Sequence, residues 1–293
     1  MIINRRSRTI FVGTLLLPSI LLVGAFVIYP LLNGLRLSFT NSSPIRPNER
    51  WVGLRNYERL LVDSAFWEVV FNSILIVGTA IVAALVIGFV FALMLNTGLR
   101  GTGFFRSAVF QVWIVPWITV TILWGWLFSA DYGIVNYTLV SLGVIDRPAN
   151  WLATPSLAQL VVILGFAWRT VPFMMVTSLA ALQGIPEELL EAAAIDGASY
   201  FKRLLFVMIP LVRNVLLTVG LLQAVRMFQE ITLLWVLTQG GPVNATTTLS
   251  LFTYKLAFQR WEFGIASAVG ALWLLMLTIF ALFYLRLFVQ PEE

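Results

Sequence analysis

The chain has 293 residues, of which 59% are hydrophobic and 11% are charged, and its formal net charge is +5. A soluble domain normally has about 25% charged residues, so this composition predicts an integral membrane protein. The chain has no cysteine and no histidine, which excludes disulfides and removes the commonest general base and metal ligand. We therefore predict no catalytic residues and no metal site. The basic residues are spread over several short loops, which argues against nucleic acid as a partner.

Six mostly apolar stretches are long enough to cross a bilayer, which takes about 20 residues. We predict membrane-spanning helices near residues 10–32, 70–95, 107–129, 157–181, 214–237 and 263–286. The predicted fold class is all-α, with a single transmembrane domain over residues 1–293. Several of these stretches contain proline, and neighbouring helices can satisfy the backbone groups that a proline frees.

The orientation of the spans is predicted from the N-terminal arginines, which are Arg5, Arg6 and Arg8 with no acidic residue beside them. Such a cluster favours a cytoplasmic start, and six spans then place both termini in the cytoplasm. The first outer loop works against this rule, because it carries five arginines. They are Arg36, Arg46, Arg50, Arg55 and Arg59. We read the first span as an uncleaved helix, because no small-residue cleavage pattern follows it.

A polar segment interrupts the apolar chain at residues 182–213, which the orientation places in the cytoplasm. Pro186 suits a first helical position, and Glu187 and Glu188 then lie in the first turn, where carboxylates offset the positive end of the helix dipole. The sequence "LLEAAAI" has high helix propensity. Asp196-Gly197 predicts the end of this helix, because glycine tolerates the left-handed conformation.

A second short helix is predicted after it, capped by Ser199 and ending at Pro210. The three alanines at 192–194 leave little bulk on the first helix, which suits docking into a cleft of another protein. The alternative is an amphipathic helix that lies on the membrane surface among the lipids.

The sequence "EAAAIDGA", with Pro210 further on, resembles the EAA motif of permease subunits in binding-protein-dependent ABC importers. The stretches "LQGIPEELLEAAAIDGASYFKRLLFVMIPLV", "LTQGGPVNATTTLSLFTYKLAF" and "WVGLRNYERLL" are similar to carbohydrate-uptake permeases, closest to the maltose and glycerol-3-phosphate permeases. The resemblance runs from about residue 10 to the C-terminus. It implies the type I importer permease fold, with the first short helix as a cytoplasmic coupling helix in a groove of the ATP-binding subunit. The coupling residues it implies are Glu187, Glu188, Glu191, Ala192, Ala193, Asp196 and Gly197.

The same resemblance implies the partners and the location of the protein. A second, homologous permease chain, two ATP-binding subunits and an extracytoplasmic solute-binding protein are expected, in the lipid of the bacterial cytoplasmic (inner) membrane. The chain contains no G-x-x-x-x-G-K-[ST] pattern. ATP and Mg are therefore expected on a separate subunit, with no cofactor in this chain.

Ionisable residues within membrane spans are costly and usually face a cavity or a partner. Arg226 and Glu230 are four residues apart, which predicts one helical face, with Gln223 on the same side. Arg169 lies in the fourth span. Two readings stay open: Arg226 and Glu230 pair with each other and steady the bundle, or they line a path and hydrogen-bond a polyhydroxylated solute.

The resemblance to the maltose permease favours the second reading, since it implies a sugar site near the bilayer midplane. The matching positions are Phe166, Arg169, Thr170, Phe173, Gln223, Arg226, Met227 and Glu230. Their residue types differ from those of the maltose protein, so a different sugar is expected. A neutral glycoside is favoured over an acidic sugar, because Glu230 can neutralise one arginine.

The loop at 238–248, "TQGGPVNATTT", is expected outside, with a tight turn at Gly240, Gly241 and Pro242. The resemblance places it near the docked solute-binding protein, and a purely structural turn would explain the glycines as well. Two other classes of function compete with the importer. A secondary transporter often shows inverted repeats, and none is visible. A membrane-embedded transferase needs clustered carboxylates or a metal set, whereas the acidic residues here are scattered.

Overall fold

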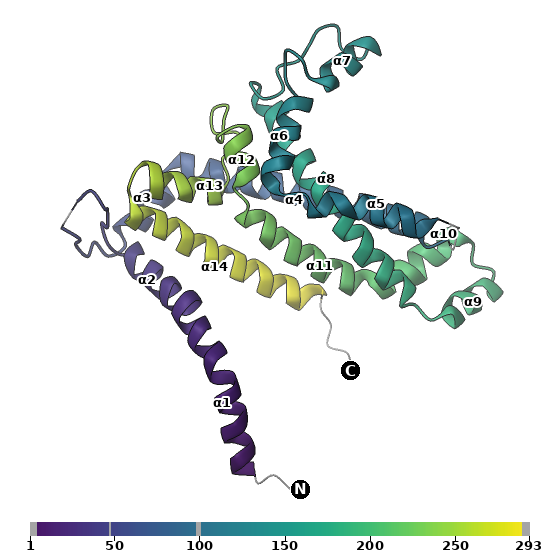
Figure 1. The fold of residues 1–293 in the computed structure, drawn as a ribbon, viewed down its shortest axis with the longest axis horizontal. Helices are drawn as coiled ribbons and strands as arrows, with labels where there is room; N and C mark the ends of the chain where they lie inside the picture. Colours follow the sequence, from purple (N-terminus) through teal and green to yellow (C-terminus); the bar gives the residue numbers. More distant parts are fainter. Residues whose placement is uncertain (1–4, 47, 98–100, 289–293) are drawn as a thin grey trace. The chain divides into compact units, whose positions relative to one another are not determined.

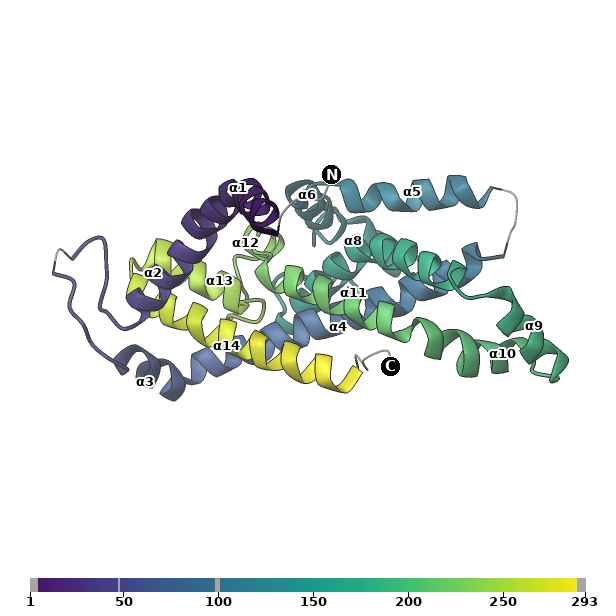
Figure 2. The ribbon, with the colours of Figure 1, turned by 90° about the horizontal axis from the view of Figure 1, so that it is seen from below.

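The computed structural model describes residues 5–46, 48–97 and 101–288. These residues are mostly helical, and β-pairing among them is limited to two isolated bridges. The chain divides into two compact units: Met1–Asp63 with Thr253–Leu275, and Ser64–Phe252 with Met276–Glu293. Figures 1 and 2 show the course of the helices from two sides. The single transmembrane domain over residues 1–293 stays a prediction.

The described helices follow one another with short connections. In chain order they are α1 (Arg5–Val23), η1 (Gly24–Ile28), α2 (Tyr29–Ser38), α3 (Arg55–Val62), α4 (Ser64–Leu95), α5 (Thr102–Ile114), α6 (Trp117–Leu127), α7 (Ile134–Ser141), α8 (Pro155–Gln183), α9 (Glu187–Ile195), α10 (Tyr200–Arg203), η2 (Leu204–Met208), α11 (Ile209–Gln229), α12 (Thr232–Leu237), α13 (Leu249–Tyr254), η3 (Lys255–Gln259) and α14 (Phe263–Phe288). The three η elements are single π-helical turns between α-helices.

Helix α8 is the centre of the second unit, where it packs against α4, α5, α6 and α11. The contact with α4 is close at Gly88, where an added Cβ would lie 2.6 Å from the Cβ of Met174. Small residues allow membrane helices to approach in this way, because association there depends on van der Waals packing. The fully buried Val161, Phe166 and Met175 show that α8 supplies much of this core.

The third predicted span, 107–129, is wrong as a single straight helix. Helices α5 and α6 meet there at an angle of 96°. The break lies at Val115-Pro116: proline has no N–H to continue the helix, and it pushes the preceding residue into extended conformation. Val115 accordingly has ψ of 128°. Within the described residues, five helices are long and apolar enough to span a membrane, or six if this bent pair is one span.

The polar segment and the fifth span also differ from the prediction. The second short helix does not end at Pro210, because α10, η2 and α11 run on as one helical segment from Tyr200 to Gln229. Pro210 lies in the first turn of α11, where its missing N–H is tolerated after the π turn. The predicted span 214–237 is interrupted at Glu230, whose backbone is extended with ψ of 126°.

The first unit contains the N-terminal apolar helix and the loop after it. Helices α1 and α2 continue through η1 to Ser38, so this helix extends beyond the predicted 10–32. The loop is fastened by Asn56 of α3, whose Nδ2 donates hydrogen bonds of 2.8 Å to the carbonyls of Ser38 and Thr40. The N–H of Gly264 in α14 donates to the carbonyl of Ser42 at 3.0 Å.

Candidate functional site: an exposed helix and a charged path

Helix α9 is exposed and carries five of the predicted coupling residues, and the other two, Asp196 and Gly197, directly follow it. Figures 1 and 2 show it beyond the ends of α8 and α11. Pro186 is the N-cap residue, one position before the predicted one, and Glu187 and Glu188 form the first turn. Among the predicted coupling residues Glu187, Glu188, Glu191, Ala192, Ala193, Asp196 and Gly197, only Ala193 is partly buried.

The end of α9 is a Schellman turn at the predicted position. Gly197 has φ of 80°, its N–H donates to Ala194, and the N–H of Ala198 donates to Ala193, each at 3.0 Å. This pattern satisfies the last carbonyls of the helix without a side chain. Ser199 follows as N-cap of α10, but its side chain makes no capping hydrogen bond.

The exposed surface of this segment is partly apolar. Ile195 is 86% exposed and Phe201 is 72% exposed, although both lie beside charged residues. Exposed apolar side chains rimmed by polar ones mark a surface for a partner or for lipid. The exposure of this segment is consistent with both alternatives, a docking helix and a helix on the membrane surface.

The four predicted path residues of α8 lie against the bend between α5 and α6. Arg169 donates from Nε to the carbonyl of Val115 at 3.1 Å, and its guanidinium carbon lies 4.3 Å from the ring centre of Trp117. Val115 is extended at the end of α5, so its carbonyl lies outside the helical hydrogen-bond pattern, and Arg169 satisfies this backbone group. Arg169 thus has a structural role at the end of α5.

Aromatic side chains surround the same bend. Phe166 meets Trp117 edge-on with ring centres 5.4 Å apart, and Phe173 stacks on Trp113 at 5.4 Å. Thr170, between them on α8, is 4% exposed. Sequence reasoning named Phe166 and Phe173 but missed both tryptophans, because only the bend brings α5 and α6 against α8.

The predicted path residues of α11 differ among themselves in burial. Gln223 and Met227 are buried, whereas Arg226 is exposed and Glu230 is partly buried. Arg226 and Glu230 form no ion pair among the described residues. The α-helix ends at Gln229, one residue before Glu230, and the shared helical face of Arg226 and Glu230 stays a prediction. Glu230 instead accepts a hydrogen bond of 2.6 Å at Oε1 from the N–H of Thr232, and its charge attracts Arg169.

The segment 238–250 is folded into the second unit, and the outer location expected for 238–248 stays a prediction. Thr246, Thr247 and Thr248 are at most 2% exposed. Thr247 donates to the carbonyl of Gly240 at 3.0 Å, and the hydroxyls of Thr238 and Thr246 lie 2.6 Å apart. Short hydroxyl side chains satisfy the backbone of a buried turn in this way.

Two side-chain amides that sequence reasoning missed, on α4 and α8, donate hydrogen bonds to the backbone of this segment. Asn72 of α4 donates to the carbonyl of Asn244 at 3.1 Å, and Gln159 of α8 donates to the carbonyl of Ala245 at 2.8 Å and to Oδ1 of Asn72 at 3.1 Å. Both are uncharged polar residues at the ends of apolar helices. Their position in the sequence signals only a helix end, so a tertiary contact was needed to find them.

A sequence profile of the family described as "Binding-protein-dependent transport system inner membrane component" matches residues 84–290. The chain belongs to this family. Its matched region includes the whole of α8, α9 and α11, so the exposed helix and the charged path both lie in the part shared with this inner membrane transport family.

Relatives and solved structures agree with the family. The trehalose/maltose transport system permease protein MalF of Thermococcus litoralis is 35% identical over 272 residues, which are 93% of this chain and 91% of that protein. The lactose transport system permease protein LacF of Rhizobium radiobacter is 33% identical over 286 residues, 94% of this chain and 92% of that one. A crystal structure of a bacterial ABC transporter involved in the import of the acidic polysaccharide alginate has the same fold, with a TM-score of 0.83 at 20% identity, covering 98% of this chain and 97% of that chain. The predicted family and fold class are confirmed.

Proposed function

We propose that the chain is the transmembrane permease subunit of an ATP-driven importer that moves a sugar or sugar derivative across the cytoplasmic membrane by alternating access. The observation that carries this proposal is α9: an exposed nine-residue helix with a rigid glycine turn, inside the matched region of a transport family. Relatives named for trehalose/maltose and for lactose transport support a carbohydrate as the solute.

The energy source is proposed to lie outside this chain. Two ATP-binding subunits would bind ATP and Mg, and α9 would dock in a groove of one of them and transmit its closure. A second permease chain would complete the pathway, and a solute-binding protein would deliver the solute from outside, with both termini of this chain in the cytoplasm. A complex of the alginate transporter with its substrate-bound periplasmic protein supports the last partner.

The proposed solute path lies at the bend of α5 and α6 and along α11. Aromatic faces there suit stacking on sugar rings, and the side chains of Thr170, Gln223 and Arg226 suit hydrogen bonds to hydroxyls. The path residues include two arginines and one carboxylate, Glu230, and of the two arginines only Arg226 is exposed. A neutral glycoside fits this balance of charges. A sugar with one acidic group is the alternative solute, and Arg226 would bind that group.

The test is ATP hydrolysis by the co-expressed assembly in lipid discs, titrated with its solute-binding protein and a panel of glycans. Stimulation of hydrolysis by one sugar-loaded binding protein is the expected result, and it would identify the solute class as well. Absence of a co-purifying ATPase, with uptake driven by an ion gradient instead, would replace the importer with a secondary transporter.

A further inference from the structure

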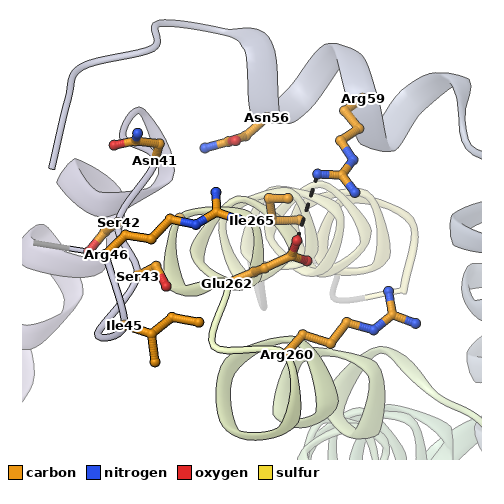
Figure 3. A pocket seen from close by; sticks show the side chains of 11 residues that line it. Asn41, Ser42, Ser43, Ile45, Arg46, Asn56, Arg59, Arg260, Glu262 and Ile265 are labelled. Atoms are coloured by element: carbon orange, nitrogen blue, oxygen red, sulfur yellow. Dashed lines mark ion pairs between the residues drawn. The ribbon is translucent and has the colours of Figure 1, made fainter. Parts of the chain in front are cut away.

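A small polar pocket lies within the unit formed by Met1–Asp63 and Thr253–Leu275. Its volume is about 160 Å³, and its walls come from the loop after α2, from α3 and from the turn before α14 (Figure 3). Arg46, Arg59 and Arg260 surround it, and Ser42 and Ser43 add hydroxyl groups. We call this site the arginine pocket.

The arginine pocket has an excess of positive charge, because its lining residues include three arginines and one carboxylate. That carboxylate, Glu262, lies 3.9 Å from Nη1 of Arg59, at the outer limit of an ion pair. Arg46 and Arg260 are exposed and have no ion-pair partner among the described residues. The pKa of the nearby Lys255 is lowered, first by burial and second by repulsion from Arg260, as expected where positive charge is not compensated.

The walls of the pocket are held in place by hydrogen bonds of the protein itself. Asn56 is 8% exposed and binds two carbonyls of the loop, and Gly264 binds the carbonyl of Ser42. A ligand that enters a preformed pocket loses little free energy to the ordering of loops. The pocket can therefore recognise an anion without first being assembled by it.

The predicted orientation places this pocket on the outer side of the membrane, where arginines oppose the usual distribution of positive charge. Two of the five arginines of the first outer loop, Arg46 and Arg59, line the pocket together with Arg260. Arginines at the outer face do not help to orient the helices, and a binding function there gives a physical reason for their presence.

We propose that the arginine pocket receives an acidic side chain of the solute-binding protein when that protein docks. This inference rests on the proposed function, and it names where and by which chemistry the partner is held. A volume of about 160 Å³ is below the roughly 300–1,000 Å³ of small-molecule sites. It admits the end of an Asp or Glu side chain, whose carboxylate matches the forked donors of arginine.

The test compares charge reversals inside and outside the pocket. Arg46→Glu and Arg260→Glu are each introduced into the full assembly in lipid discs, with Arg50→Glu as the matched control. Arg50 is an exposed arginine of the same loop that does not line the pocket. The dissociation constant of the loaded solute-binding protein is measured at two salt concentrations, and ATP hydrolysis without binding protein reports whether each assembly is intact.

The expected result is a roughly tenfold weaker binding for each pocket variant and less than about a twofold change for Arg50→Glu, with a smaller salt dependence in the pocket variants. Equal binding by wild type and both pocket variants would overturn the inference, as would an equal loss in Arg50→Glu. A loss that follows the fraction of anionic lipid in the discs would also overturn it, since the pocket would then hold a lipid headgroup. If the wild-type assembly neither binds nor responds to a solute-binding protein, the proposed function itself fails.

Discussion

Helix α9 and the segment 238–250 are both short polar stretches between apolar helices of the same unit, but α9 is exposed, whereas residues 245–250 of the second stretch are buried. In α9 the polar groups point to solvent, and the helix end is closed by its own backbone. In 238–250 the polar groups bind one another and two amides of α4 and α8. A change in α9 should therefore affect a partner, whereas a change around 238–250 should affect the stability of the fold.

The largest expected effect is that of Gly197→Asp on coupled transport. The residue has φ of 80° and open space around the position of a Cβ, so the variant adds backbone strain and a charge on the docking surface without a clash. Uptake should fall at least about tenfold, while the melting temperature changes by only a few degrees, as about 1–2 kcal/mol of strain implies.

The matched control for this variant is Gly143→Asp. Gly143 also has positive φ and open space, and it closes α7 with the same pair of backbone hydrogen bonds, from Gly143 to Val140 and from Val144 to Leu139. Similar strain without loss of uptake is expected there. Equal loss of uptake in both variants would show that strain alone, and not a docking surface, explains the effect.

The next effect is that of Asn72→Leu on stability. The variant removes the donor to Asn244 and the acceptor for Gln159 and leaves polar groups of a buried segment unpaired. Such a loss costs about 1–3 kcal/mol, so thermal unfolding in detergent should shift down by several degrees. Asn214→Leu on the exposed side of α11 is the control with little expected change. An unchanged melting temperature for Asn72→Leu would mean that the buried segment is held by packing alone.

Arg226→Ala and Glu230→Gln test whether the charged residues at the C-terminal end of α11 bind the solute. Glutamine keeps the oxygen that accepts from Thr232, so Glu230→Gln should unfold at about the wild-type temperature and still reduce uptake severalfold if this carboxylate binds solute. Exposed Arg226 has no ion-pair partner to lose among the described residues. Its removal should likewise lower uptake without loss of stability. Normal uptake in both variants would remove these residues from the proposed path.

The smallest effect is expected for Ile195→Ser. This side chain is 86% exposed, so its loss should leave the unfolding temperature unchanged and weaken binding of the ATP-binding subunit by roughly fivefold, in line with the partial burial of one aliphatic side chain. Leu142→Ser, at the 71% exposed position before Gly143, is the matched control. Binding that is equal in both variants would place the docking contact elsewhere on α9.

Local chemistry was sufficient to predict much of this molecule. The membrane class, the approximate spans and the helix–glycine turn at 187–197 follow from composition, apolar run length and the conformational freedom of Gly197, all of which act over a few residues. The break at Pro116 has a local cause as well. The predicted span 107–129 treats Pro116 as a tolerated proline, although a proline in a membrane helix can also end the helix.

Tertiary structure alone decided which polar groups meet. Arg169 reaches the carbonyl of Val115, 54 positions away in the chain, and Gln159 reaches Ala245, 86 positions away. The burial of 245–250 and the grouping of Arg46 and Arg59 with Arg260 depend on contacts of the same kind. The sequence by itself determined where the chain is apolar and where its helices turn, because those properties are local. The pairing of polar groups depends on which helices pack together, because a buried donor or acceptor must find a partner wherever the fold brings one.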